Sequence, residues 1–298
     1  MKILLLGKDG QVGRELQRTL LPLGEVIALG RHGADLSDLE ALHATLEAHR
    51  PDVIVNAAAY TAVDKAESDR DMAAQINFRA VSALAKYAKA RDALLTHYST
   101  DYVFDGASRS PHTEVDLVGP QSVYGATKLA GETAITDSGC RAIVFRTSWV
   151  FSSHGSNFLK TILRLAQTKS SLNVVADQFG APTSAELIAD VTALAVNGYH
   201  RNQFADGIYH LAASGEASWC EFARYIVSQA SARGAALQLT ADGINAIPAA
   251  DYPTPAKRPQ NSRLNTSKLS QALQLQLPHW TAHTDRAIDQ LIKIGIPT

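Results

Sequence analysis

Tyr124 and Lys128, in the stretch YGATK, are the residues whose types and spacing best suit acid–base chemistry. The run 122–136 contains no proline and predicts a helix. Tyr124, Thr127 and Lys128 follow i, i+3, i+4 spacing, so we expect them on one face. A tyrosine with an ordinary pKa of about 10 exchanges protons poorly at neutral pH, but a cation one turn away lowers that pKa. The pair therefore predicts a general acid/base, although the same spacing also suits an ordinary surface contact.

A glycine-rich turn, GKDGQVG at 7–13, lies between an apolar run at Lys2–Leu6 and an amphipathic stretch at 12–23. Glycines such as Gly7 and Gly13 permit a tight turn and let backbone N–H groups approach a diphosphate, which the following helix N-terminus attracts. The spacing GxxGxxG also occurs in plain turns. Its position after the first strand favours dinucleotide binding.

The end of the second predicted strand bears on which nicotinamide is used. NADH-selective sites place an acid there, which repels a 2′-phosphate, whereas this chain has Gly30 followed by Arg31. If Arg31 turns inward it can bind a 2′-phosphate; if it faces solvent, both cofactors should be accepted. We predict that NADPH is preferred and that NADH still works. Asp35 and Leu36 are placed to contact the edge of the adenine, although Asp35 also suits the start of a helix.

Two further strand ends carry residues that suit a cofactor and a substrate. Small residues after the third strand let a flat cofactor pass over the sheet edge, and they also suit tight packing. Thr100 closes the next strand, where its hydroxyl can bind a substrate carbonyl oxygen while Tyr124 exchanges the proton; Thr100 can also cap a turn. The residues after the third strand are Ala57, Ala58, Ala59, Tyr60 and Thr61.

Composition excludes several classes of protein. The chain has 298 residues, 46% hydrophobic and 19% charged, with a net charge of -1 and no long Lys/Arg run, so nothing in it would gather nucleic acid or an anionic membrane. Two cysteines give no disulfide framework, and the N-terminal apolar run is too short for a signal peptide. No run of eighteen apolar residues could span a membrane. These features predict a cytoplasmic protein.

Strands and helices alternate along the first half, which predicts a doubly wound parallel α/β sheet of the Rossmann type over residues 1–150. Strands are expected at Lys2–Leu6, Glu25–Leu29, Val53–Asn56, 94–99 and 141–147, and helices at 12–23, 39–47 and 71–90. Residues 151–298 should form mainly a smaller α/β substrate domain, with a segment near 184–212 packing back on the first. There we expect helices at 157–166, 186–196 and Trp219–Ala232, and strands at Leu172–Val175 and 208–211.

The glycine turn, the NAAA strand end, the Ser-Thr-Asp strand end and YxxxK together resemble the extended short-chain dehydrogenase/reductase family. RTSWVF at 146–151, DQFGAPT at 177–183 and YPTPAKRPQNSRL at 252–264 narrow the resemblance to the members that reduce dTDP-linked keto sugars, over nearly the whole chain. The resemblance implies hydride transfer from NADPH or NADH to C4 of dTDP-4-dehydro-6-deoxy-L-mannose, giving dTDP-L-rhamnose. It also implies a homodimer.

The resemblance further implies residue roles. Tyr124 would donate the proton, Lys128 would bind the nicotinamide ribose and tune Tyr124, and Thr100 would orient the keto oxygen. Cofactor contacts are implied for Gly10, Gln11, Val12, Asp35, Leu36, Ala59, Tyr60 and Thr61, and sugar-side positions for Asp101, Tyr102 and Trp149.

Three aromatic or basic side chains suit the sugar nucleotide on chemical grounds as well. The indole of Trp149 offers a flat apolar face to a sugar ring, or else packs in the core. Arg258 and Arg263, in a proline-flanked loop, suit a nucleotide diphosphate; the alternative is a solvated turn.

Glu186 and Asp190 form an i, i+4 carboxylate pair, and Glu15 lies on the first predicted helix. Some members of the family are thought to hold magnesium with such carboxylates at a dimer interface, so these three are a candidate Mg²⁺ site. Otherwise they are solvated acids.

Other functions remain to be weighed. An epimerase or dehydratase uses the same Tyr/Lys pair, but a dehydratase needs Asp-Glu directly after the threonine, and here Asp101 is followed by Tyr102. An NADP-binding regulatory subunit is disfavoured because Tyr124, Lys128 and Thr100 are intact. A nucleic-acid or structural role has no basic patch to support it.

Overall fold

A six-stranded parallel sheet forms the centre of the molecule, in a computed structural model that describes residues 1–296. The strand order is β10-β5-β4-β3-β1-β2, and every neighbouring pair is parallel. The strands are β1 (Lys2–Leu6), β2 (Glu25–Leu29), β3 (Val53–Asn56), β4 (Leu94–Thr100), β5 (Ala142–Thr147) and β10 (Gly207–His210). The predicted doubly wound sheet is confirmed. Its order reverses between β1 and β3, which is where such sheets bind ligands.

The sheet is buried on both faces, and its first strand is an uninterrupted apolar run from Ile3 to Leu6. Ile3 and Leu5 of β1 belong to one hydrophobic cluster, and the alternate residues Leu4 and Leu6 belong to the other. Side chains of a strand point to opposite faces in turn, so an uninterrupted apolar run requires cover on both sides.

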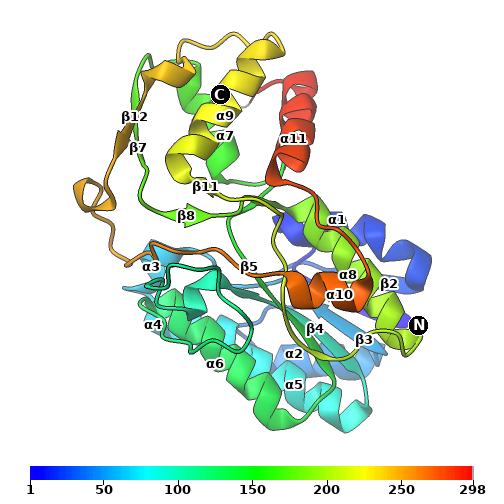
Figure 1. Cartoon of the computed structure of the whole chain (residues 1–298). Helices are drawn as coiled ribbons and strands as arrows, with labels where there is room; N and C mark the ends of the chain where they lie inside the picture. Colours follow the sequence, from blue (N-terminus) through cyan, green and yellow to red (C-terminus); the bar gives the residue numbers. More distant parts are fainter. Residues whose placement is uncertain (297–298) are drawn as a thin grey trace.

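Helices supply that cover, as Figure 1 shows. On one face lie α1 (Gln11–Thr19) and α8 (Ala185–His200). The other face carries α2 (Leu39–His49), α5 (Ala80–Arg91) and α6 (Val123–Ser138).

The helix expected at 71–90 is present, but it contains a π-helical turn. It is divided into α4 (Arg70–Ala74), a π-helical turn η2 (Gln75–Arg79) and α5, preceded by the short α3 (Val63–Ala66). The extra residue in the π turn reorients the side chains that follow it, with consequences for Asn77 described below.

A second lobe stands above the sheet in Figure 1. It contains α7 (Phe158–Ala166), α9 (Trp219–Ala232), α11 (Trp280–Ile294) and the parallel pair β7 (Leu172–Val175) and β12 (Ile244–Ile247). Two-residue strands connect the lobes: β6 (Val150–Phe151) pairs with β9 (Thr183–Ser184), and β8 (Phe179–Gly180) with β11 (Ala217–Ser218). The remaining elements are α10 (Ser267–Leu273) and the short turns η1 (Leu21–Leu23), η3 (Asp101–Val103), η4 (Ala241–Gly243) and η5 (Ala249–Asp251).

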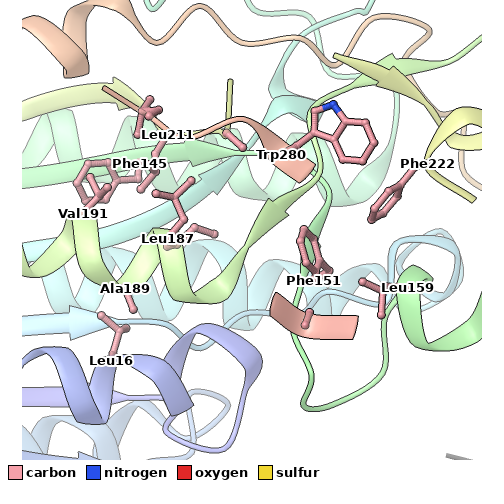
Figure 2. Packing of buried hydrophobic residues seen from close by; sticks show 14 of the residues in the cluster. Leu16, Phe145, Phe151, Leu159, Leu187, Ala189, Val191, Leu211, Phe222 and Trp280 are labelled. Carbon is pink, nitrogen blue, oxygen red and sulfur yellow. The ribbon is translucent and has the colours of Figure 1, made fainter. Parts of the chain in front are cut away.

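One hydrophobic cluster runs from the sheet into the second lobe. Leu16 of α1 and Leu187 of α8 belong to the same cluster as Phe151, Phe222 and Trp280 (Figure 2). The lobes therefore hold each other in place through buried apolar contact. Within residues 1–296 no helix has the length and apolar character to cross a membrane.

Candidate active site

The residues that follow β1, β2, β3, β4 and β5 meet at one edge of the sheet. Because the strands are parallel, their carboxyl ends lie together. The register pairs Leu6 with both Leu29 and Asn56, and Thr100 with Thr147. The glycine turn, the residues after Asn56 and the Thr100 strand end are thereby brought to the edge that the sequence predicted.

The glycine turn is tightly packed between α1 and the end of β3. Gly7 has a positive φ of 82°, and a Cβ there would lie 2.6 Å from the Ala58 nitrogen; a Cβ on Gly13 would lie 2.0 Å from the Gly7 oxygen. Helix α1 begins at Gln11, and Gly10 at its N-cap provides no side-chain bond. The N–H groups of the first turn have no intrahelical partners and can bind an anion. This arrangement fits a dinucleotide diphosphate.

The sequence indicated no carboxylate at the end of β2, and the structure corrects this expectation. A Cβ on Gly30 would lie 2.0 Å from Asp9 Oδ2, so the carboxylate of Asp9 occupies the place where the sequence suggested none. Arg31 is exposed, and its Nε donates to Asp35 Oδ2 at 3.2 Å. Hydrogen bonds from Ser37, with Arg31 beside it, lower the pKa of Asp35. Arg31 must leave this surface pair before it can bind a 2′-phosphate.

Asn77, in the π turn, fixes the loop after β3. Its Oδ1 accepts from the Tyr60 N–H at 2.9 Å, while Nδ2 donates to the Tyr60 oxygen at 3.1 Å and to Thr127 Oγ1 at 3.2 Å. The Tyr60 hydroxyl donates to Asp69 at 3.0 Å. Asn77 therefore joins the predicted cofactor loop 57–61 to α6, which carries Tyr124.

Two glycines bring α6 against its neighbours. The helix predicted over 122–136 is present as α6, and the Ser122 hydroxyl caps it by accepting from the Gly125 N–H at 3.1 Å. A Cβ on Gly125 would lie 2.2 Å from the Tyr102 oxygen, and one on Gly131 would lie 2.4 Å from the Asn77 oxygen. Only glycine allows α6 to approach this closely, so the two glycines determine the position of Tyr124.

Tyr124 and Thr100 lie close together at the strand edge. Burial raises the pKa of Tyr124 to about 12, and the Thr100 hydroxyl acts in the opposite direction. Thr100 Oγ1 donates to Asp101 Oδ1 at 3.0 Å and accepts from the Tyr102 N–H at 3.2 Å. The Tyr102 ring meets the Tyr124 ring edge-on, with centroids 5.6 Å apart. Burial also raises the pKa of Asp101, to about 6.

Lys128 is buried on the same helix, and burial, Thr100 and Asp101 are what shift the pKa of Tyr124, so the tuning of Tyr124 by Lys128 stays a prediction. Lys128 Nζ donates to the Tyr98 oxygen at 2.6 Å and contacts His97 Nε2 at 3.1 Å. His97 Nδ1 in turn contacts Asn56 Nδ2 at 3.2 Å. Burial lowers the pKa of Lys128 to about 8. Sequence reasoning missed His97 and Asn56, although a polar residue in each buried apolar strand was the available signal.

Trp149 does not present the open apolar face that was expected. Its indole stacks on Trp219 with centroids 3.5 Å apart, and a Cβ on Gly180 would lie 2.6 Å from the same ring. Trp149 has a φ of 49°, an unfavourable value for a residue other than glycine. Such local strain is typical of functional positions. Its contact with the sugar stays a prediction, and Trp219 is an additional candidate.

The two candidate arginines differ. Arg258 Nη2 donates to Asp64 at 2.8 Å, and its Nη1 is buried without a hydrogen-bond partner in the described part of the chain. Arg258 thus retains a donor for a ligand. Arg263 donates to Asn261, Glu216 and the Arg109 oxygen through Nε, Nη1 and Nη2. Its geometry supports a role in holding this loop, in place of the predicted diphosphate contact.

The candidate magnesium residues are already paired with cations. Glu186 accepts from Arg286 at 2.9 Å, and Asp190 accepts from Arg18 at 3.0 Å. Burial and the nearby Glu186 raise the pKa of Glu15. Across residues 1–296, no three His, Cys, Asp or Glu side chains gather as a metal site requires. The magnesium ion and the homodimer stay predictions.

The chain is similar to known proteins in both sequence and structure. A family model described as the RmlD substrate binding domain matches residues 1–293. The dTDP-4-dehydrorhamnose reductase of Escherichia coli strain K12 is 48% identical over 295 residues, covering 98% of each chain. A solved dTDP-4-dehydrorhamnose reductase from Clostridium acetobutylicum has a TM-score of 0.89 at 34% identity, covering 98% of this chain and 100% of that one. The Bacillus anthracis enzyme, solved with NADP, has a TM-score of 0.87 at 30% identity, covering 97% and 99%.

Proposed function

The chain belongs to the RmlD substrate binding domain family, and from that membership we propose that it is an NAD(P)H-dependent reductase of dTDP-4-dehydro-6-deoxy-L-mannose. The reaction reduces the C4 keto group and gives dTDP-L-rhamnose. The observation that carries the proposal is the placement of Tyr124 and Thr100 together, at the sheet edge that also holds the glycine turn.

The chain's own residues act on the proton and on the position of the substrate. The bound nicotinamide supplies the hydride. Tyr124, whose raised pKa keeps it protonated at neutral pH, donates its proton to the C4 oxygen as negative charge develops there. When the Thr100 hydroxyl releases its hydrogen bond to Asp101, it can donate to the same oxygen and orient it. Arg258, with one buried free donor, is the candidate contact for the sugar nucleotide's diphosphate.

We propose that NADPH is preferred and that NADH is also used. Support comes from Arg31, which directly follows Gly30 at the end of β2, because the surface pair it must leave is worth only about 0–1 kcal/mol. Asp9, next to Gly30, opposes a 2′-phosphate and limits the preference.

Elimination chemistry lacks a residue that it needs. A dehydratase of this family requires a second acid directly after the aspartate, and Tyr102, with a raised pKa from burial, is a poor substitute. This favours simple reduction over the dehydratase alternative.

Loss of reduced-nicotinamide absorbance with dTDP-4-keto-6-deoxy-L-mannose tests the function directly. We expect turnover with this sugar nucleotide and much slower turnover with its UDP counterpart. Oxidation of the cofactor with neither compound, under conditions in which the cofactor binds, would contradict the proposal.

A further inference from the structure

A buried chain of hydrogen bonds runs from β3 to α6 beneath the proposed active site. Asn56, His97 and Lys128 are each only 1% exposed. Asn56 Nδ2 lies 3.2 Å from His97 Nδ1, and His97 Nε2 lies 3.1 Å from Lys128 Nζ. Because water has no access, each group must be satisfied by its neighbour, and the direction of each hydrogen bond can be worked out.

The direction is set at the Asn56 end. The backbone N–H of Ala58 can only donate, and it donates to Asn56 Oδ1 at 3.2 Å. The amide nitrogen of Asn56 therefore faces His97 and donates to Nδ1. Turning the amide over would place its NH₂ group against the Ala58 N–H, two donors with no acceptor between them.

The hydrogen bond from Asn56 to His97 also fixes the direction of the hydrogen bond between His97 and Lys128. With Nδ1 accepting, a neutral His97 carries its proton on Nε2 and donates it to Lys128 Nζ. An ammonium group has no lone pair, so Lys128 accepts only as a free amine, which still donates to the Tyr98 oxygen. Burial acts in the same sense, because it lowers the pKa of His97 well below its ordinary range and that of Lys128 to about 8.

Among the other charged or titratable groups around Lys128 within residues 1–296, only Glu132 opposes the free amine. Glu132, one turn further along α6, favours the ammonium, but its carboxylate is bound by Arg146 of β5 at 2.6 Å. Tyr124 of α6 is uncharged because its pKa is raised. On β4 the contacts are His97 itself and the carbonyl oxygen of Tyr98.

We propose that His97 is a positioning residue that holds Lys128 as a free amine until the nicotinamide cofactor binds, so that binding transfers a proton from solvent to Lys128. The inference rests on the proposed function, since the cofactor brings the diphosphate charge and the hydroxyl acceptors that favour an ammonium. One N–H bond forms on Lys128, the buffer loses the proton, and the hydrogen bond from His97 Nε2–H to Lys128 is given up, because an ammonium cannot accept it. Above about pH 8, the cation that favours the Tyr124 phenolate is then present only when the hydride donor is bound.

Calorimetry of NADH binding measures this proton directly. NADH is the probe because it lacks the titrating 2′-phosphate. At about pH 9, above the pKa of Lys128 and below the ordinary lysine value of about 10.4, the heats in two buffers of different ionisation enthalpy give the protons taken up. We expect the wild type to take up close to one proton per NADH.

Two substitutions should abolish the uptake while NADH still binds. His97→Gln can place an amide oxygen towards Lys128, and Asn56→Asp keeps the histidine but accepts from Nδ1–H, so that Nε2 becomes the acceptor. In both, Lys128 is already an ammonium. Tyr98→Phe is the matched control, because the Tyr98 hydroxyl bonds to Thr192, and it should keep the uptake. A purely structural role for His97 would not give Asn56→Asp this effect.

The histidine tautomer provides a second readout that needs no cofactor. Nitrogen-15 NMR of the free protein should show His97 protonated on Nε2, with its signal assigned by its loss in His97→Gln. Protonation on Nδ1, or NADH binding to the wild type without proton uptake, would overturn the inference. If NADH does not bind at all, the proposed use of NADH fails, and the tautomer of His97 still tests whether Lys128 is a free amine.

Discussion

Tyr124 is the residue on which the proposed chemistry depends most. Tyr124 is partly buried and keeps its proton, which suits an acid that serves a reduction. We expect Tyr124→Phe to lower turnover by about a hundredfold or more, the usual scale for loss of a general acid, with cofactor binding retained. Tyr98→Phe, which removes a hydroxyl bound to Thr192, is the control and should stay active. More than about a tenth of wild-type turnover in Tyr124→Phe would remove it as proton donor.

Cofactor choice depends on two side chains near Gly30. Asp9→Asn removes a carboxylate that repels a 2′-phosphate, so the ratio of kcat/KM for NADPH over NADH should rise. Arg31→Ala should lower that ratio, by about tenfold to a hundredfold if the contact is desolvated, chiefly through NADPH. Both cofactors are measured on both variants and on the wild type. Ratios that do not change would mean that neither side chain reaches the phosphate.

At the residue level, sequence predicts best where spacing alone decides. The shared face of Tyr124 and Lys128 follows from helix periodicity, and the glycine turn follows from its place after a strand. Asp9 beside Gly30 and Trp219 on Trp149 are contacts between segments distant in sequence, which no local pattern contains.

At the level of elements, the buried strands were the most predictable. The bounds of β1, β2 and β3 agree with the sequence expectation because each is an apolar run that ends at polar or small residues. The helix expected at 71–90 is present, but the sequence did not predict its π-helical turn, in which Asn77 hydrogen-bonds to Tyr60. Two-residue strands such as β8 are too short to leave a pattern.

The buried ion pair between α6 and β5 supports the helix that carries Tyr124. Arg146 donates to Glu132 at 2.6, 3.0 and 3.2 Å, and both side chains are buried. Glu132→Gln leaves a buried guanidinium without its counter-charge, so we expect a loss of about 3–5 kcal/mol in the free energy of unfolding. Urea denaturation measures it.

An exposed pair serves as the control for that measurement. Glu47→Gln, which breaks the surface pair with Arg91, should cost under about 1 kcal/mol. The double variant Glu132→Leu, Arg146→Met should recover most of the loss, since it leaves no charge unpaired. Equal costs for Glu132→Gln and Glu47→Gln would show that the buried pair does little to hold α6.

At the scale of the whole molecule, the two lobes share one core and should unfold together. Phe151 and Phe222 lie in the same buried cluster as Leu5 of the sheet (Figure 2 shows the two aromatic residues). Sequence could indicate a second lobe from its separate elements, but not this continuity, because the contacting residues lie far apart along the chain. One cooperative transition makes the pH dependence of stability interpretable.

Lys128 should make the stability depend on pH in the alkaline range. Its pKa is about 8 in the folded protein and about 10.4 in the unfolded chain, so between these values the unfolded state binds more protons. Stability therefore rises with pH through this window, by up to roughly 3 kcal/mol, until tyrosines that ionise in the unfolded chain near pH 10 reverse the trend. Urea unfolding between about pH 7.5 and 9.5 measures the slope. Lys128→Met should remove the rise, and a wild type whose stability is flat or falls in this range would mean that the folded lysine keeps its proton.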